Sequence, residues 1–213
     1  MKSIGHFING KEQLAVLGST EKSKNLGLHV AAEPVGVKNP LNEDVNSMRV
    51  SLIPGLIRNL VQNYRHGNEM GRLFEVGSVF EKGSAKSYEE FFHLAFCFWG
   101  QNRSHWQAAE KTPVVYELRE TVTNMLNALK IDGWSWQELK TDEVPEYLHP
   151  GQAIGLKVEG KVIGVFGSLH PSLVSKYKIR TSVAMGEFDF ENLMARQPRY
   201  RKFQSLSRFQ RVD

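Results

Sequence analysis

The chain has 213 residues and a net charge of +4, and 41% of its residues are hydrophobic, enough for a buried core in one large or two small domains. It contains no run of about 18 apolar residues, and its N-terminal MKSIGHFINGKEQ lacks the layout of a secretory signal. The single cysteine, Cys97, excludes an internal disulfide, and its apolar neighbours favour a buried thiol. We therefore expect a globular cytoplasmic protein.

The first half of the chain predicts two helices before the first long strand. Lys11 to Leu17 favours a short helix. The stretch SLIPGLIRNLVQNY, residues 51–64, has leucines four residues apart, which is typical of a helix with one apolar stripe. Pro54 suits the first turn of that helix, and Ser51 is a suitable cap.

The stretch RLFEVGSVFE, residues 72–81, alternates in polarity and predicts a strand with two carboxylates on one face. Glu75 and Glu81 share that face, and the opposite face carries Arg72, Phe74, Val76, Ser78 and Phe80. Six residues of strand separate the two carboxylates by roughly 20 Å, which excludes direct paired acid–base chemistry. The remaining alternative is a charged face that meets solvent or a basic partner.

The second half predicts the rest of a sheet and its covering helices. FHLAFCFWG, residues 92–100, is apolar on both faces and belongs in the middle of a covered sheet. Thr112-Pro113 starts an amphipathic helix with proline at its first position, and Glu159-Gly160 is a hairpin turn within the alternating residues 153–166. The last expected elements are a short helix, a strand and a helical turn, at residues 171–177, 183–190 and 192–193. Together they predict an α+β fold, an antiparallel sheet flanked by helices.

No pattern in the sequence is typical of a metal site or a catalytic triad. LHP occurs at residues 148–150 and 169–171, yet no pair of histidines, His93 and His105 included, has the short spacing of metal-binding histidines. Both LHP stretches favour turns, one before a strand and one before a helix. GSLHP is not a GxSxG elbow, and phosphate-binding glycine loops are absent from the sequence. We therefore predict no catalytic residue and no metal ligand.

Several motifs nevertheless follow one another in a recognisable order. KNPLNED, MRVSLIPGL and LFEVGSVF resemble the core of the phenylalanyl-tRNA synthetase β subunit family, whose hallmarks are an NPL stretch, SLLPGLL and LFEIGxVF. YLHPGQA, VFGSLHP and VAMGEFDFENL continue the resemblance, whereas FQSLSRFQRVD resembles the start of the family's C-terminal anticodon-binding domain, with Gln210 replacing its usual proline. We expect a core domain over residues 1–197, then a basic linker and a truncated further domain over residues 198–213.

The resemblance implies a class II aminoacyl-tRNA synthetase-like fold whose ATP site is degenerate. In catalytic modules of this class, the strand equivalent to residues 72–81 ends in an arginine that meets the α-phosphate of ATP, and this chain has Glu81 there. Farther on, the catalytic Glu-Arg-Leu pattern is replaced by Glu191, Asn192 and Leu193. Triphosphate binding depends on fixed positive charge, which Glu81 and Asn192 do not supply.

The resemblance also implies an (αβ)2 phenylalanine–tRNA ligase in which the catalytic α subunit is the partner of this chain. ATP and Mg²⁺ then serve the whole enzyme and tRNA(Phe) binds the full complex. For this segment we expect no cofactor, no membrane and no DNA. The candidates for a subunit interface are Arg49, Ile57, Val61 and Phe74. Packing within the chain is the alternative for each, and a buried arginine needs a partner.

Two other functions remain as alternatives to this non-catalytic, assembly-forming role. A self-sufficient class II-like amino-acid ligase needs cations elsewhere for its phosphates, and the suitable ones are Arg49, Arg72 and Arg103. A free-standing RNA-binding module would use the basic tail, with Arg199, Arg201 and Lys202 as contact candidates. We rank the tail lower, because a tail without a folded platform gives little specificity.

Overall fold

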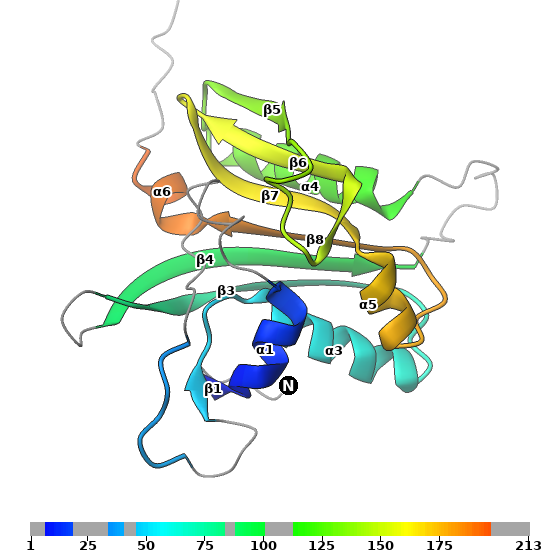
Figure 1. Ribbon diagram of the computed structural model, residues 1–213. Coiled ribbons are helices and arrows are strands. Elements are labelled where there is room, and N and C mark those ends of the chain that lie inside the picture. Colours follow the sequence, from blue (N-terminus) through cyan, green and yellow to red (C-terminus); the bar gives the residue numbers. More distant parts are fainter. Residues whose placement is uncertain (1–6, 19–33, 41–45, 84–87, 101–112, 197–213) are drawn as a thin grey trace, which may run out of the picture.

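Six antiparallel strands form the central sheet of the protein in a computed structural model that describes residues 7–18, 34–40, 46–83, 88–100 and 113–196 (Figure 1). Along the sheet the order of the strands is β3-β4-β8-β7-β6-β5. Their bounds are β3 (Gly71–Lys82), β4 (Tyr88–Trp99), β5 (Trp134–Glu138), β6 (Leu148–Val158), β7 (Lys161–Leu169) and β8 (Val183–Asp189). The α+β prediction is confirmed.

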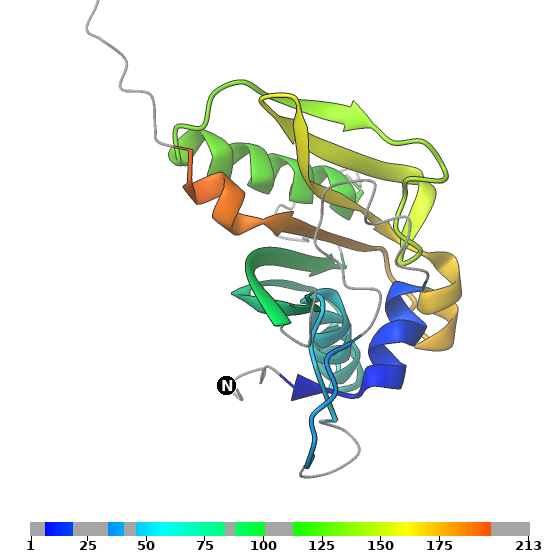
Figure 2. The same ribbon diagram turned by 60° about the vertical axis from the view of Figure 1, so that its left-hand side comes forward.

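Helices cover both faces of this sheet and bury a separate apolar cluster on each. On one side, the α3 face, lie α1 (Gly10–Leu17), α3 (Ile53–Arg65) and α5 (Pro171–Lys176). On the other, the α4 face, lie α4 (Val114–Ala128) and α6 (Phe190–Met194). Figure 2 shows α4 and α3 separated by the strands. A two-stranded sheet of β1 (Phe7–Ile8) and β2 (Ser47–Met48) lies beside α1.

The apolar stripe predicted for residues 51–64 forms the buried side of α3. Leu56, Ile57, Leu60 and Val61 are all at most 8% exposed. Burying each such side chain contributes about 1.5–3 kcal/mol, which a 13-residue helix needs because isolated helices of that length are marginal in water. Pro54 lies in the first turn, as predicted.

Strand β4 lies between β3 and β8 and is buried on both faces in its second half, which confirms its predicted central place. Its odd-numbered residues, such as Cys97, face the α3 cluster, and even-numbered ones, such as Phe98, face the α4 cluster. Cys97 is fully buried, and burial raises the pKa of its thiol, with a smaller opposing effect from the charge of Arg72. The predicted buried thiol is confirmed.

The hairpin and the second LHP turn also agree with the sequence, whereas the turn expected at the first LHP is wrong because residues 148–150 are part of strand β6. Glu159 and Gly160 join β6 to β7 with φ values of 48° and 88°, as a two-residue turn with positive φ at both positions requires. The first LHP begins β6, and in the second, His170 caps α5 by accepting a hydrogen bond from Ser172 N.

Several further details were wrong or missed, among them the short strands β1 and β2. Pro113 precedes α4 as its N-cap residue instead of occupying its first position, and Thr112 lies outside the described residues. Strand β5, which was not expected, pairs with β6 at the sheet edge. No helix within the described ranges is long and apolar enough to cross a membrane. The domain boundary expected at residue 197 lies outside them and stays a prediction.

Candidate functional site

A row of polar groups lies on the α3 face of the sheet, where residues 47–53 run from β2 into α3. Glu75 of β3, Ala95 of β4 and Glu187 of β8 are direct cross-strand neighbours, so their side chains share this face. Two strand spacings place the Cα atoms of Glu75 and Glu187 about 10 Å apart. The sheet therefore brings together a pair of carboxylates different from the pair Glu75 and Glu81 considered in the sequence.

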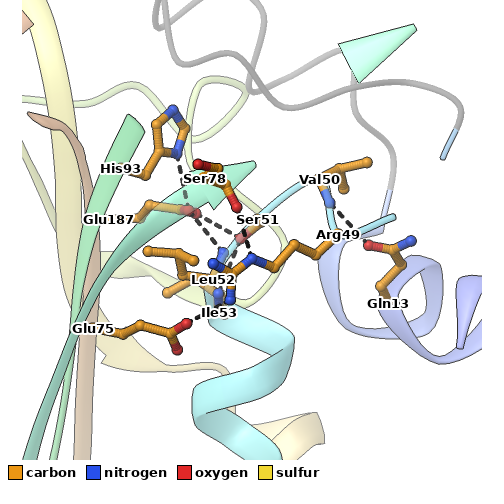
Figure 3. A network of polar contacts seen from close by, with 10 residues as sticks. All are labelled: Gln13, Arg49, Val50, Ser51, Leu52, Ile53, Glu75, Ser78, His93 and Glu187. Atoms are coloured by element: carbon orange, nitrogen blue, oxygen red, sulfur yellow. Dashed lines mark hydrogen bonds and ion pairs between the residues drawn. The ribbon is translucent and has the colours of Figure 1, made fainter. Parts of the chain in front are cut away.

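Glu187 is the centre of this row and is only 2% exposed. Its carboxylate accepts hydrogen bonds from Ser51 Oγ at 2.6 Å and from Leu52 N at 2.9 Å, and His93 Nδ1 lies 3.0 Å away (Figure 3). A buried carboxylate is tolerated when it is hydrogen-bonded in this way. Because two of the donors belong to the start of α3, Glu187 also provides the negative charge that a helix N-terminus favours.

Ser51 and His93 complete the surroundings of Glu187. The Ser51 hydroxyl also accepts a hydrogen bond from Ile53 N at 3.1 Å, so the serine holds the first turn of α3 much as the sequence suggested, although Leu52 occupies the N-cap position. The Nε2 atom of His93 is buried and has no hydrogen-bond partner in the described part of the chain. Tyr147 is fully buried, and this burial raises the pKa of its hydroxyl well above the usual value. The negative charge of Glu187 raises the pKa of Tyr147 further.

Arg49 joins the same segment to the edge strand β3. It is 4% exposed, its Nε donates to the Ser78 carbonyl at 2.7 Å, and its Nη1 forms an ion pair of 2.5 Å with Glu75 (Figure 3). The Arg49 carbonyl accepts from Phe80 N at 2.9 Å. Glycine at position 77 leaves room for this guanidinium, because a Cβ on it would lie 2.3 Å from Arg49 Nη2 and Arg49 would have to shift. The sequence left solvent or a basic partner as alternatives for the charged face of this strand. For Glu75 the basic partner is Arg49.

Gln13 of α1 fixes the other side of the segment. This fully buried side chain donates from Nε2 to Ser47 Oγ at 2.9 Å and to the Met48 carbonyl at 3.2 Å, and its Oε1 accepts from Val50 N at 3.1 Å. Residues 47–53 are thus held from α1 on one side and from the sheet on the other. Most polar groups of this face are bonded to the protein itself, and His93 Nε2 is the exception among those named here.

The two positions proposed for a degenerate ATP site lie toward one end of the sheet. Glu81 is half-buried near the end of β3, opposite Glu89 in the register of β4. Asn192 donates from its backbone N to Asp189 Oδ1 at 2.8 Å and from its side-chain Nδ2 to Asp189 Oδ2. Asp189 is the N-cap residue of α6, so the Asn192 side chain binds the carboxylate that caps this helix.

The interface candidates divide by exposure. Ile57 and Val61 are 1% and 8% exposed and belong to the α3 cluster, and Arg49 is buried with Glu75, so these three side chains pack within the chain. Phe74 is 69% exposed, and for this residue a place in the core is wrong. The RNA-contact candidates Arg199, Arg201 and Lys202 lie outside the described residues.

The cations proposed for a self-sufficient nucleotide site are similarly engaged. Arg72 points to the α4 face, where its guanidinium pairs with Glu117 at 2.5 Å and lies 5.2 Å from the centre of the Phe98 ring. Arg49 is on the opposite face, bound to Glu75, and Arg103 is outside the described residues. Within the ranges described, no three histidine, cysteine, aspartate or glutamate side chains form a group suited to a metal ion.

Comparison with known proteins identifies relatives over nearly the whole chain. Residues 12–190 match the family model described as phenylalanyl tRNA synthetase beta chain CLM domain. The chain is 41% identical over 208 residues to the phenylalanine–tRNA ligase beta subunit of Bdellovibrio bacteriovorus, with 97% of this chain and 26% of that protein covered. It is 31% identical over 177 residues to that of Aromatoleum aromaticum, with 80% and 22% covered. The chain thus spans about a quarter of the length of these curated relatives.

A solved structure shares the fold. PylSc of Desulfitobacterium hafniense, a pyrrolysyl tRNA synthetase, superposes with a TM-score of 0.59 at 18% identity, over 91% of this chain and 58% of that one. At this identity the likeness concerns the fold alone. It agrees with an antiparallel sheet flanked by helices.

Proposed function

Because the chain belongs to the family of phenylalanyl-tRNA synthetase β chains, we propose that it is the assembly-forming core of a phenylalanine–tRNA ligase β subunit. Its class II-like sheet supports the attachment of phenylalanine to tRNA(Phe), while the partner α subunit binds ATP and performs the chemistry. This chain by itself is non-catalytic.

The observation that carries the proposal is the closure of the α3 face by residues 47–53. Arg49 and Glu187, the buried charges of this face, are bonded to Glu75 and to Ser51, Leu52 and His93. A ligand there would have to displace these bonds, and separating a buried ion pair leaves an uncompensated charge that costs about 3–5 kcal/mol. The face is suited to holding the domain together and unsuited to holding a substrate.

The charges at the positions considered for phosphate binding also argue against a nucleotide. A triphosphate is held in enzymes by cations fixed at its oxygens. Glu81 and Asn192 stand where the resemblance places arginines, and the Asn192 amide donates to Asp189. The ion pairs of Arg49 and Arg72 leave neither guanidinium available for phosphate.

Magnesium does not fit the carboxylates of this face either. Mg²⁺ requires oxygen ligands with nearly octahedral geometry. Glu187 uses its oxygens to accept from Ser51 and Leu52, and Glu75 binds the Arg49 cation. We therefore assign ATP and Mg²⁺ to the partner subunit.

Calorimetry of the purified chain with ATP and Mg²⁺, and separately with phenylalanine, tests the non-catalytic role. The expected result is the absence of saturable heat, because no cation of the closed face is left for the phosphates. The complex with the α subunit serves as the positive control. Saturable binding of either ligand to this chain at micromolar concentrations would refute the proposal.

A further inference from the structure

An open hollow of about 660 Å³ lies on the α4 face, between the start of β4 and α6. Small-molecule sites usually have volumes of roughly 300–1,000 Å³, so this hollow is large enough for a ligand. Its apolar floor is formed by Phe92 and Phe190, whose ring centres are 5.9 Å apart, and by Met194. Phe92 is 42% exposed and Met194 is 55% exposed, so much of this apolar surface faces water.

Three polar side chains at the hollow take part in no ion pair or hydrogen bond within the described residues. Glu90 and Glu191 border the hollow and are exposed. Ser78 also lines it but is only 9% exposed, and the hydrogen bond that Ser78 accepts from Arg49 goes to its carbonyl. A hydroxyl buried to this extent normally has a partner. The Ser78 hydroxyl is therefore available to a group placed in the hollow.

The charge around the hollow is negative. No described cation lines it, and Arg196, which follows α6, is paired with Glu159 at 2.5 Å. An anionic ligand, ATP or the carboxylate of phenylalanine included, would meet two carboxylates here. A bare metal ion would make no use of the apolar floor. The hollow thus favours a ligand that is cationic and apolar at once.

We propose that the hollow binds an aliphatic diamine, a molecule in which methylene groups join two ammonium groups. The methylene chain lies on the floor of Phe92, Phe190 and Met194. One ammonium group meets Glu90 and the other meets Glu191, and Ser78 Oγ accepts a hydrogen bond from one of them. An ammonium group close to a phenyl ring also gains a cation–π contact. This binding requires neither ATP nor phenylalanine, so it goes beyond the assembly role.

Calorimetry of the full chain with cadaverine, a five-carbon diamine, at low salt tests this site. We expect saturable heat with a dissociation constant of roughly 0.1–1 mM, because ion pairs at exposed carboxylates and a cation–π contact are each modest. Pentylamine has the same chain with a single ammonium group, and it binds up to about fivefold more weakly because one ion pair is lost. Absence of saturable heat with cadaverine overturns the proposal and leaves the result with ATP and phenylalanine unaffected.

Variants separate this site from a general effect of charge. Glu90→Gln and Glu191→Gln each weaken cadaverine binding by up to about fivefold, and the double variant binds cadaverine no better than the wild-type chain binds pentylamine. The control Glu120→Gln, Glu138→Gln removes the same charge at exposed sites on α4 and β5 and leaves the affinity unchanged. Equal affinities of the two double variants overturn the proposal.

NMR spectra of the methionine methyl groups locate the bound diamine. Met194 lines the hollow, so its methyl resonance, identified by its loss in Met194→Leu, shifts as cadaverine is added to the wild-type chain. The resonance stays in place with phenylalanine at the same concentration. Saturable heat from cadaverine without a shift at Met194 means that the diamine binds elsewhere, which refutes the assignment to this hollow.

Discussion

Replacing Arg49 by methionine tests the closure of the α3 face most directly. The change keeps most of the apolar stem and removes the guanidinium, which lies 2.5 Å from Glu75 and donates to the Ser78 carbonyl. Glu75, whose side chain is 14% exposed, then loses this cationic partner. Removing one partner of a buried pair typically costs about 3–5 kcal/mol. Because Glu75 retains some contact with water, we expect about 3 kcal/mol at pH 7.

Urea denaturation of the full chain measures this loss as a lower midpoint with an unchanged slope. In thermal unfolding it corresponds to roughly 6–12 °C for a protein of this size. Arg58→Met is the matched control, because the Arg58–Glu12 pair has side chains 45% and 39% exposed and such pairs contribute only about 0–1 kcal/mol. The double variant Arg49→Met, Glu75→Leu recovers most of the loss, since it leaves no charge unpaired. An Arg49→Met loss no larger than that of Arg58→Met would refute the reasoning.

Two further outcomes follow from exposure and from ionisation. Phe74→Ser, at a side chain 69% exposed, changes the stability of the chain by no more than about 0.5 kcal/mol but weakens co-purification with the α subunit. The control Tyr116→Ser on α4, at a side chain 55% exposed, leaves both the stability and the co-purification unchanged. Equal retention of the two variants by the α subunit contradicts an interface at Phe74. Because the pKa of Tyr147 is raised in the folded state, this side chain stays protonated above pH 10 while it ionises in the unfolded state. The free energy of unfolding therefore falls as pH rises, by up to about 1.4 kcal/mol per pH unit, and Tyr147→Phe removes that contribution. Identical pH profiles of the wild-type and variant proteins between pH 10 and 11 count against the raised pKa.

Local sequence patterns were sufficient to predict the helices that bury one apolar stripe and the strands that bury one set of alternating residues. Residues 51–64 and the Glu159-Gly160 turn behaved as predicted, because helix periodicity and positive φ are properties of neighbouring residues. Strand β5 was missed because its sequence, WSWQE, is short and has no apolar residue besides tryptophan.

The polar row on the α3 face had no comparable local signal. Glu187 and Ser51 are 136 residues apart in the sequence, and only the pairing of β4 with β8 brings Glu187 beside Ala95. The glutamate in VAMGEFDF was the only hint, since a charge inside a strand that is mostly apolar needs a partner. The exposure of Phe74 was equally hidden, because it depends on β3 being an edge strand that α4 does not cover at that point.

The hydrogen bonds from Ser51 and Leu52 to Glu187 have a consequence for synthesis on the ribosome. Translation proceeds at about 5–20 residues per second, so Glu187 follows Ser51 by roughly 7–27 s. During that interval the beginning of α3 exists without its carboxylate, and the two strands that flank β4 in the finished sheet, β3 and β8, are not both present. The first turn of α3 therefore lacks its buried carboxylate acceptor until β8 has been synthesised, so its native hydrogen bonds form late.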